Sequence, residues 1–153
     1  MKRIAFILGF VMIFTLPAVI FGGGFQVYPG ARLEDNYEIK QPEVGGKVTK
    51  PLKVFVFTTN DPFESVVAFY RSIGREYRMP GSGGKPATLS SGQELKEAYF
   101  IFDNASDLST SKHWVKIQRP YLGRDQMGAG FHGKPGATRD VTAIIEEDKR
   151  SYP

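Results

Sequence analysis

The chain has 153 residues, a formal net charge of +4, no cysteine and 13% aromatic residues. Without cysteine it has neither a disulfide framework nor a lipid-modified cysteine, so its stability must come from a hydrophobic core. The charge is mild and no dense stripe of Lys and Arg is present, which excludes the usual basic surface for nucleic acid.

The first 24 residues have the layout of a secretory signal peptide, with a basic pair, an uncharged run over 4–21 and three closing glycines. We expect cleavage before Phe25, or alternatively after Ala18, and a periplasmic or secreted location. The competing interpretation is an uncleaved anchor in the inner membrane formed by residues 4–21. Pro17 and the glycines interrupt a helix where a span needs continuity, which favours cleavage.

Residues 25–153 are expected to form a single domain. A Pro-Gly turn opens it, and Asn36–Ile39 predicts a short strand. Leu52–Thr59 is rich in β-branched and aromatic residues and predicts a second strand.

A helix should follow directly. Asp61 can cap it, Pro62 suits its first position, and Glu64 completes a capping-box spacing. Gly74 is a natural stop. The apolar positions that recur on one helical face, and so predict core residues, are Phe63, Val66, Val67, Tyr70 and Ile73.

The second half of the chain predicts three more strands and two mobile loops. Residues 79–92 are rich in glycine, proline and serine and predict the first loop. The strands are expected at Glu94–Asp103, His113–Pro120 and Arg139–Asp148, with the second mobile loop at 121–138.

Consecutive strands without intervening helices favour antiparallel pairing. We therefore predict an α+β fold in which one amphipathic helix packs on a four- to five-stranded, mainly antiparallel sheet, preceded by the N-terminal signal helix. Apolar residues such as Val54 and Phe55 point to both faces of the sheet, so the second face needs a cover. The chain's own segments are the favoured cover, with a homodimer through the sheet face or an apolar ligand as alternatives.

The stretch Gly128–Pro135 fits two nucleotide-binding patterns by letter but neither by context. No apolar strand leads into it, no helix follows it, and Pro135 stands where a P-loop needs a hydroxyl. We predict no nucleotide and no cofactor, and a poorly ordered loop. Arg124, His132 and Lys134 remain candidates for contact with an anionic ligand.

The two histidines are far apart and lack the spacing of metal ligands, so no metal is predicted. Asp103–Asp107 predicts a turn whose side chains bond the backbone, rather than a calcium loop. His113 and Arg119 are further candidates for ligand contact. An enzymatic alternative uses His113 with Asp103 and Arg119, and a pocket in which His113 meets an acidic group would favour it.

Three motifs, YPGA, DPFESVVAFY and WVKIQRPYLG, resemble small exported bacterial proteins of uncharacterised function. The resemblance implies export and a bacterial source, and it brings no catalytic residues. The leading hypothesis is a non-enzymatic binding or assembly domain of the envelope. Its partner would be an unknown envelope protein or a small ligand, bound on the sheet face away from the helix. The alternative is a small periplasmic enzyme or an enzyme's accessory domain.

Overall fold

The computed structural model describes residues 24–39, 51–80, 86–123 and 138–150. The predicted signal helix, with the alternative anchor, and most of the glycine-rich loop lie outside the described residues. Within the parts that are described, no helix has the length and apolar character to cross a membrane.

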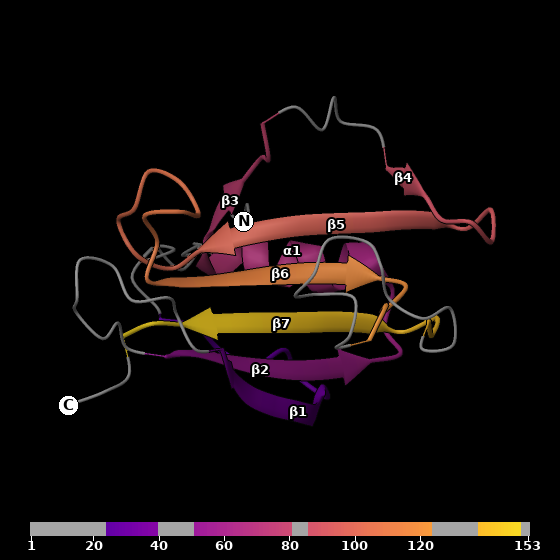
Figure 1. Ribbon diagram of the computed structural model, residues 1–153, viewed down its shortest axis with the longest axis horizontal. Coiled ribbons are helices and arrows are strands. Elements are labelled where there is room, and N and C mark those ends of the chain that lie inside the picture. The colour runs from indigo at the N-terminus through magenta and orange to yellow at the C-terminus, as the bar shows by residue number, and fades with distance from the viewer. Residues whose placement is uncertain (1–23, 40–50, 81–85, 124–137, 151–153) are drawn as a thin grey trace, which may run out of the picture.

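One helix and seven strands make up the regular structure of the described residues (Figure 1). In chain order they are β1 (Arg32–Ile39), β2 (Leu52–Thr59), α1 (Phe63–Ile73), β3 (Arg75–Tyr77), β4 (Ala87–Thr88), β5 (Glu94–Ile101), β6 (His113–Arg119) and β7 (Thr142–Asp148). The strands pair antiparallel in the order β1-β2-β7-β6-β5-β3, and β4 pairs separately with β5. The predicted α+β fold, with one helix on a mainly antiparallel sheet, is confirmed.

The sheet has seven strands rather than the four to five that the sequence predicts. The two additional strands, β3 and β4, are short and exist through their pairing with β5: Tyr77 lies opposite Tyr99, and Ala87 lies opposite Leu95. β1 likewise begins four residues before Asn36, in a polar stretch that pairs with β2. Pairing with a distant segment leaves no local hydrophobic pattern, so sequence periodicity did not reveal these strands.

The face predicted to be buried on α1 is buried. Val66 and Tyr70 are 0% exposed, and Val67 is also in the core. Figure 1 shows α1 behind β5 and β6, and these strands supply Phe100 and Val115 to the same cluster. Burying a side chain the size of valine contributes about 1.5–3 kcal/mol, so this face alone ties the helix to the sheet.

The predicted capping box is not formed. Pro62 occupies the N-cap position with φ −58° and ψ 146°, and no side chain caps the helix. Asp61 therefore lies one position too early, and its carboxylate accepts a hydrogen bond from the Tyr28 hydroxyl at 2.8 Å. Glu64 pairs instead with Lys96 of β5 at 2.6 Å. Because Pro62 occupies the N-cap position with an extended backbone, the capping box that the sequence spacing predicts for Asp61 and Glu64 does not form.

The helix ends at Gly74, as predicted, but for a different physical reason. Gly74 has φ −132° and ψ 164°, an extended conformation that any residue can adopt. A Cβ atom built there would lie 2.9 Å from two ring carbons of Phe102. Glycine is therefore required by the close approach of the ring rather than by a left-handed backbone.

The segment ahead of β1 closes the core on the helix side of the sheet. Phe25 stacks on Tyr70 with ring centroids 6.0 Å apart, and it meets Phe102 and His113 edge-on at 5.7 and 5.6 Å. The Tyr70 hydroxyl donates to the carbonyl oxygen of Gln26 at 3.1 Å. Ring packing of this kind and the hydrogen bond fix the segment in place.

The opposite face of the sheet carries a second apolar cluster. Leu52, Val54 and Val56 of β2 pack there beside Ile145 of β7. Tyr121, which follows β6, lies against them and is 3% exposed. At this end of the face the cover comes from the chain itself, which is the option that the sequence favours.

Candidate ligand-binding site

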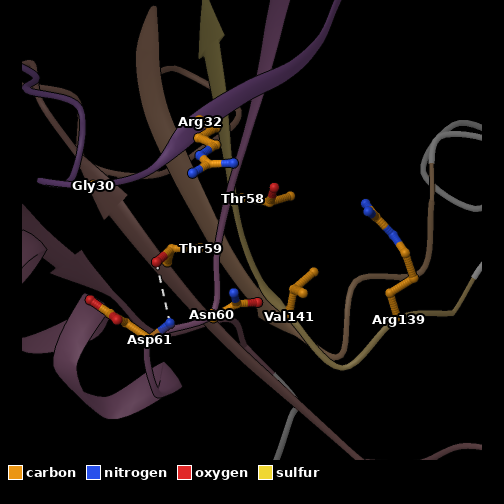
Figure 2. Close-up of a pocket in the computed structure, with 8 residues that line it drawn as sticks. All are labelled: Gly30, Arg32, Thr58, Thr59, Asn60, Asp61, Arg139 and Val141. Carbon is orange, nitrogen blue, oxygen red and sulfur yellow. Dashed lines mark hydrogen bonds between the residues drawn. The ribbon is translucent and has the colours of Figure 1, made fainter.

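An open pocket of about 430 Å³ lies where β2 ends and the chain turns into α1 (Figure 2). This volume falls within the range of small-molecule sites. The wall comes from the start of β1, the end of β2 with the loop after it, and the residues before β7. The lining residues are Gly30, Arg32, Thr58, Thr59, Asn60, Asp61, Arg139 and Val141.

The predicted Pro-Gly turn brings β1 to the pocket. The Ala31 N–H donates to the Tyr28 carbonyl at 3.0 Å, and Gly30 adopts a φ of 82° that favours glycine. This turn leads directly into Arg32 at the first position of β1. The position of Arg32 thus follows from the local turn chemistry.

Arg119 of β6 fixes the loop between β2 and α1 from behind. Its Nη1 donates to the carbonyl oxygen of Asp61 at 2.9 Å and to Thr142 Oγ1 at 3.2 Å. Thr142 is fully buried, and its hydroxyl donates to the same Asp61 carbonyl at 2.7 Å. The Arg119 Nε also bonds Asp140 at 2.9 Å. These bonds hold the pocket wall against β6 and β7. The wall is therefore in place before a ligand binds.

One guanidinium of the pocket already holds a carboxylate. Arg139 donates to Glu34 Oε1, and the Thr58 hydroxyl donates to Glu34 Oε2 at 3.1 Å. Arg139 also lies over the Tyr121 ring, 5.3 Å from its centroid. The hydrogen bond from Arg139 is the main cause that lowers the pKa of Glu34. Glu34 is therefore held as an anion against two groups of the lining.

The other guanidinium of the pocket is unpaired. Arg32 makes no hydrogen bond or ion pair with the residues that the structure describes. Figure 2 shows Thr58 between Arg32 and Arg139, while the Asp61 carboxylate is directed away from Arg139. That carboxylate is engaged by the Tyr28 hydroxyl, and this bond raises the pKa of Tyr28. The centre of the pocket thus presents positive charge and hydroxyl groups, which suits a polar or anionic ligand.

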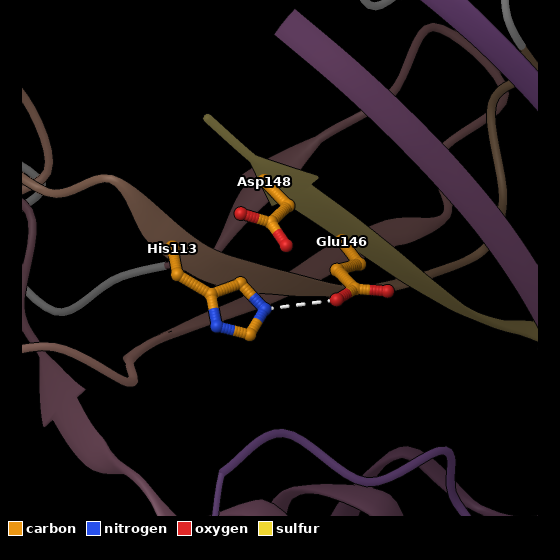
Figure 3. A group of neighbouring side chains, drawn as sticks. All are labelled: His113, Glu146 and Asp148. Atoms are coloured by element: carbon orange, nitrogen blue, oxygen red, sulfur yellow. Dashed lines mark hydrogen bonds and ion pairs between the residues drawn. The ribbon is translucent and has the colours of Figure 1, made fainter. Parts of the chain in front are cut away.

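His113 lies in the interior and not in this pocket (Figure 3). Its Nε2 is 2.8 Å from Glu146 Oε1, and the imidazole is 1% exposed. The rings of Phe25 and Phe102 pack against it. Its Nδ1 has no hydrogen-bond partner in the part of the chain that the structure describes. His113 and an acidic group therefore meet within hydrogen-bond distance, but without access for a substrate.

Three buried side chains at the end of β7 could together offer ligands to a metal ion. The ligand atoms of His113, Glu146 and Asp148 lie within 4.8 Å of one another. Asp148 is bonded by the Arg150 guanidinium at 3.1 and 3.2 Å, and Glu146 is bonded to His113. The arrangement as it stands is an internal network that consists of the His113–Glu146 hydrogen bond and the Arg150–Asp148 ion pair. The prediction of no metal considered only the spacing of the two histidines. It missed that Glu146 and Asp148, two positions apart on β7, lie on the same face of that strand.

The residues of the predicted enzymatic alternative do not form one group. The Asp103 carboxylate accepts a hydrogen bond from the Ala105 N–H at 3.1 Å, within the predicted turn, and further bonds from the backbone N–H groups of Lys112 and His113 at 2.6 and 3.2 Å. Glu146, rather than Asp103, meets the imidazole. Arg119 lies at the opposite end of β6 from His113. The length of β6 thus separates His113 from Arg119.

The pocket residues were not singled out from the sequence. Arg32 and Arg139 come from opposite ends of the domain, and no window of sequence contains both. The sequence pointed only to Arg119, which was predicted as a ligand contact and supports the pocket wall. The remaining predicted ligand contacts, which lie outside the described residues, are Arg124, His132 and Lys134.

The described residues form an α+β domain with one helix, an antiparallel sheet and a surface pocket whose lining includes two arginines. Comparisons with family models, curated proteins and solved structures gave no significant match. Its chemistry is therefore argued from its own residues.

Proposed function

We propose that this chain is an exported, non-enzymatic binding domain of the bacterial envelope that takes a small polar ligand in the pocket at the end of β2. The observation that carries this proposal is the guanidinium of Arg32 in the pocket wall, which has no partner among the residues that the structure describes. A guanidinium offers five donors in a fixed fork and accepts nothing, so it is complementary to an acceptor on a ligand. The bonds from Arg119 hold the surrounding wall in place before any ligand arrives.

Binding is supported over catalysis by the composition of the lining. No imidazole, thiol or amine lies among the described lining residues. The hydroxyl of Thr59 accepts a hydrogen bond from the Asp61 N–H at 3.2 Å, and the Asp61 carboxylate accepts from the Tyr28 hydroxyl instead of activating Thr59. The buried pair of His113 and Glu146 lies toward the far end of β7, and neither residue lines the pocket.

Export is supported by the sequence alone. The charged start, the uncharged run over 4–21 and the closing glycines fit a signal peptide. A domain without cysteine also needs no oxidative folding outside the cytoplasm. The intact mass of the protein from an envelope fraction tests this part, and a full-length mass in the cytoplasm would contradict it.

Ligand binding can be tested by amide NMR on protein purified after expression of the full chain. Mixtures of neutral sugars, amino acids, carboxylic acids and phosphates serve as probes. We expect saturable shifts at Thr58, Thr59 and Asn60 with at least one class. Asn60 is exposed and its side chain makes no hydrogen bond with described residues, so Asn60→Trp should fill the pocket without disturbing the frame. We expect it to weaken binding by about tenfold or more.

The matched control is Asn104→Trp, which places the same ring on an exposed turn after β5. It should leave the affinity unchanged. Shifts that Asn60→Trp does not weaken, or no shifts with any class, would remove the pocket from the proposal. Conversion of a probe into a new product would contradict the non-enzymatic part.

A further inference from the structure

The pocket wall already shows which ligand chemistry it accepts, because a carboxylate of the chain itself is bound there. Glu34 extends from β1, and its two oxygens are held by different groups: one by the Arg139 guanidinium and the other by the Thr58 hydroxyl. Both donors line the pocket, whereas Glu34 does not. The wall therefore satisfies a planar carboxylate with one charged and one neutral donor.

One cation of the wall has no ion-pair partner among the described residues. Arg139 is paired with Glu34, and the Asp61 carboxylate, which is directed away from Arg139 in Figure 2, accepts a hydrogen bond from the uncharged Tyr28 hydroxyl. Arg32 has no such partner among the described residues, although it lines the same pocket. A ligand carboxylate at Arg32 would complete the pairing without any change in the wall.

The same features disfavour other small ligands. A cationic ligand would meet the guanidinium of Arg32, which has no partner among the described residues, while the Asp61 carboxylate is directed away from Arg139 (Figure 2). A neutral sugar would leave the charge of Arg32 unpaired. A phosphate also fits a guanidinium fork, but it is tetrahedral and carries more charge than the carboxylate that this wall already holds. The demonstrated pairing at Glu34 is planar and uses two donors.

We infer that the ligand of this pocket carries a carboxylate, that Arg32 binds it, and that Glu34 competes with it for Arg139 and Thr58. This inference rests on the proposed binding function. In the free protein Glu34 occupies two of the donors and leaves Arg32 as the open position. A ligand with a second carboxylate can then exchange with Glu34 on Arg139. The carboxylate can belong to a free small acid or to the end of a peptide chain.

The experiment titrates the purified protein with succinate, with a short peptide ending in a free carboxylate, and with the same peptide ending in an amide. Inorganic phosphate and a neutral disaccharide complete the set. Binding is followed by the amide shifts of the pocket residues. We expect succinate or the free-acid peptide to bind and the amide to fail, and the comparison distinguishes the two sources of carboxylate.

Two charge variants test the roles of the named residues. Arg32→Gln should weaken carboxylate binding by about tenfold, because it removes a charged donor. Arg78→Gln removes an equal charge from an exposed site after β3 and should have little effect. Glu34→Gln should strengthen binding by about threefold, because it releases Arg139 from an exposed ion pair. Glu38→Gln, which removes an equal charge from the same strand, is its control.

The outcomes separate this inference from the proposed function. If sugars or phosphate bind in the pocket and carboxylates do not, the binding function stands and the carboxylate inference is wrong. If no probe changes the amide shifts of the pocket residues, the binding function and the carboxylate inference are both wrong. An unchanged affinity in Arg32→Gln overturns the role of Arg32, and weaker binding in Glu34→Gln overturns the competition. Thermal unfolding of each variant identifies any loss that comes from misfolding.

Discussion

Glu147 shows how a single side chain can set the response of this domain to pH. It lies on the sheet face away from α1, opposite Trp114 of β6 and Val54 of β2. Burial raises the pKa of Glu147 to about 7, against smaller lowering effects of Lys149 and Lys116. The side chain is thus protonated in the folded protein over a range in which the unfolded chain is ionised.

We predict that this residue makes the protein less stable as the pH rises from about 4.5 to about 7. In that window the folded state holds a proton that the unfolded state lacks, so stability falls by up to about 1.4 kcal/mol per pH unit. Urea unfolding near pH 5 and near pH 7.5 measures the change. Glu147→Gln cannot ionise, and its free energy of unfolding should depend less on pH. Glu94→Gln, at an exposed site, should retain the native profile. Parallel curves for the protein and Glu147→Gln would contradict this account.

At the scale of elements, the pair of His113 and Glu146 joins the start of β6 to the end of β7. Both side chains are buried, and their contact of 2.8 Å lies beneath the rings of Phe25 and Phe102. Removing one partner leaves the other without compensation in the interior. Breaking a buried pair in this way is strongly destabilising, whereas replacing both groups by apolar ones is often neutral.

We therefore expect His113→Leu and Glu146→Leu each to lower the free energy of unfolding by about 3 kcal/mol or more. The double variant should recover much of that loss, and chemical denaturation of all four proteins gives the coupling energy. Ligand binding in the pocket should persist in every variant that folds. Strictly additive losses would show that the two groups do not act as a pair.

The elements differ in how far the sequence could predict them. β2 was predicted with its observed ends, because its apolar residues lie in one local run. β3 was missed because Arg75–Tyr77 becomes a strand only through its partner β5. The stop at Gly74 was predicted correctly, but the Phe102 ring that requires it lies on a distant segment. The local sequence pattern thus predicted a strand whose apolar residues lie in one continuous stretch, and it missed a strand that depends on a distant partner.

The candidate site was harder to predict than the fold. Its charge pattern depends on which guanidinium is paired, and Glu34 meets Arg139 across 105 positions of sequence. The residues selected for their chemistry, such as His113, proved to have interior partners. Arg119 was selected as a ligand contact and instead supports the wall. A list of reactive residue types therefore does not distinguish a side chain with an internal partner from an unpaired one.

For the whole molecule, the question left open by the sequence is a homodimer through the sheet face. One end of that face is covered by Tyr121, and on the other Lys116 pairs with Glu97 at 2.5 Å. Of the large hydrophobic side chains that are exposed in the described residues, Ile39 lies on that face because it pairs with Leu52. Leu33 pairs with Phe57 on the helix side, and Val27 and Met79 lie outside the strands. They do not form a patch on that face, and an interface needs a contiguous apolar core.

We predict that the protein is a monomer. Sedimentation at micromolar concentration should give one species of no more than 17.0 kDa. A dimer that persists on dilution would contradict this expectation. In that case Lys116→Glu, which places like charges beside Glu97 on the sheet face, would show whether the face forms the contact. The same protein should still bind its ligand, because the pocket lies at the edge of the sheet.

The position of Phe25 has a consequence for the timing of export. On the proposed cleavage before Phe25, the bond to be cut joins Gly24 to a residue whose ring stacks on Tyr70. Proteolysis acts on the open form of a chain, and the folded domain closes around this residue. Processing and folding would then compete for the same segment, and cleavage would have to come first. If the aromatic core formed before cleavage, the signal segment would stay attached. The rate of folding would therefore decide whether the domain is released or stays tethered.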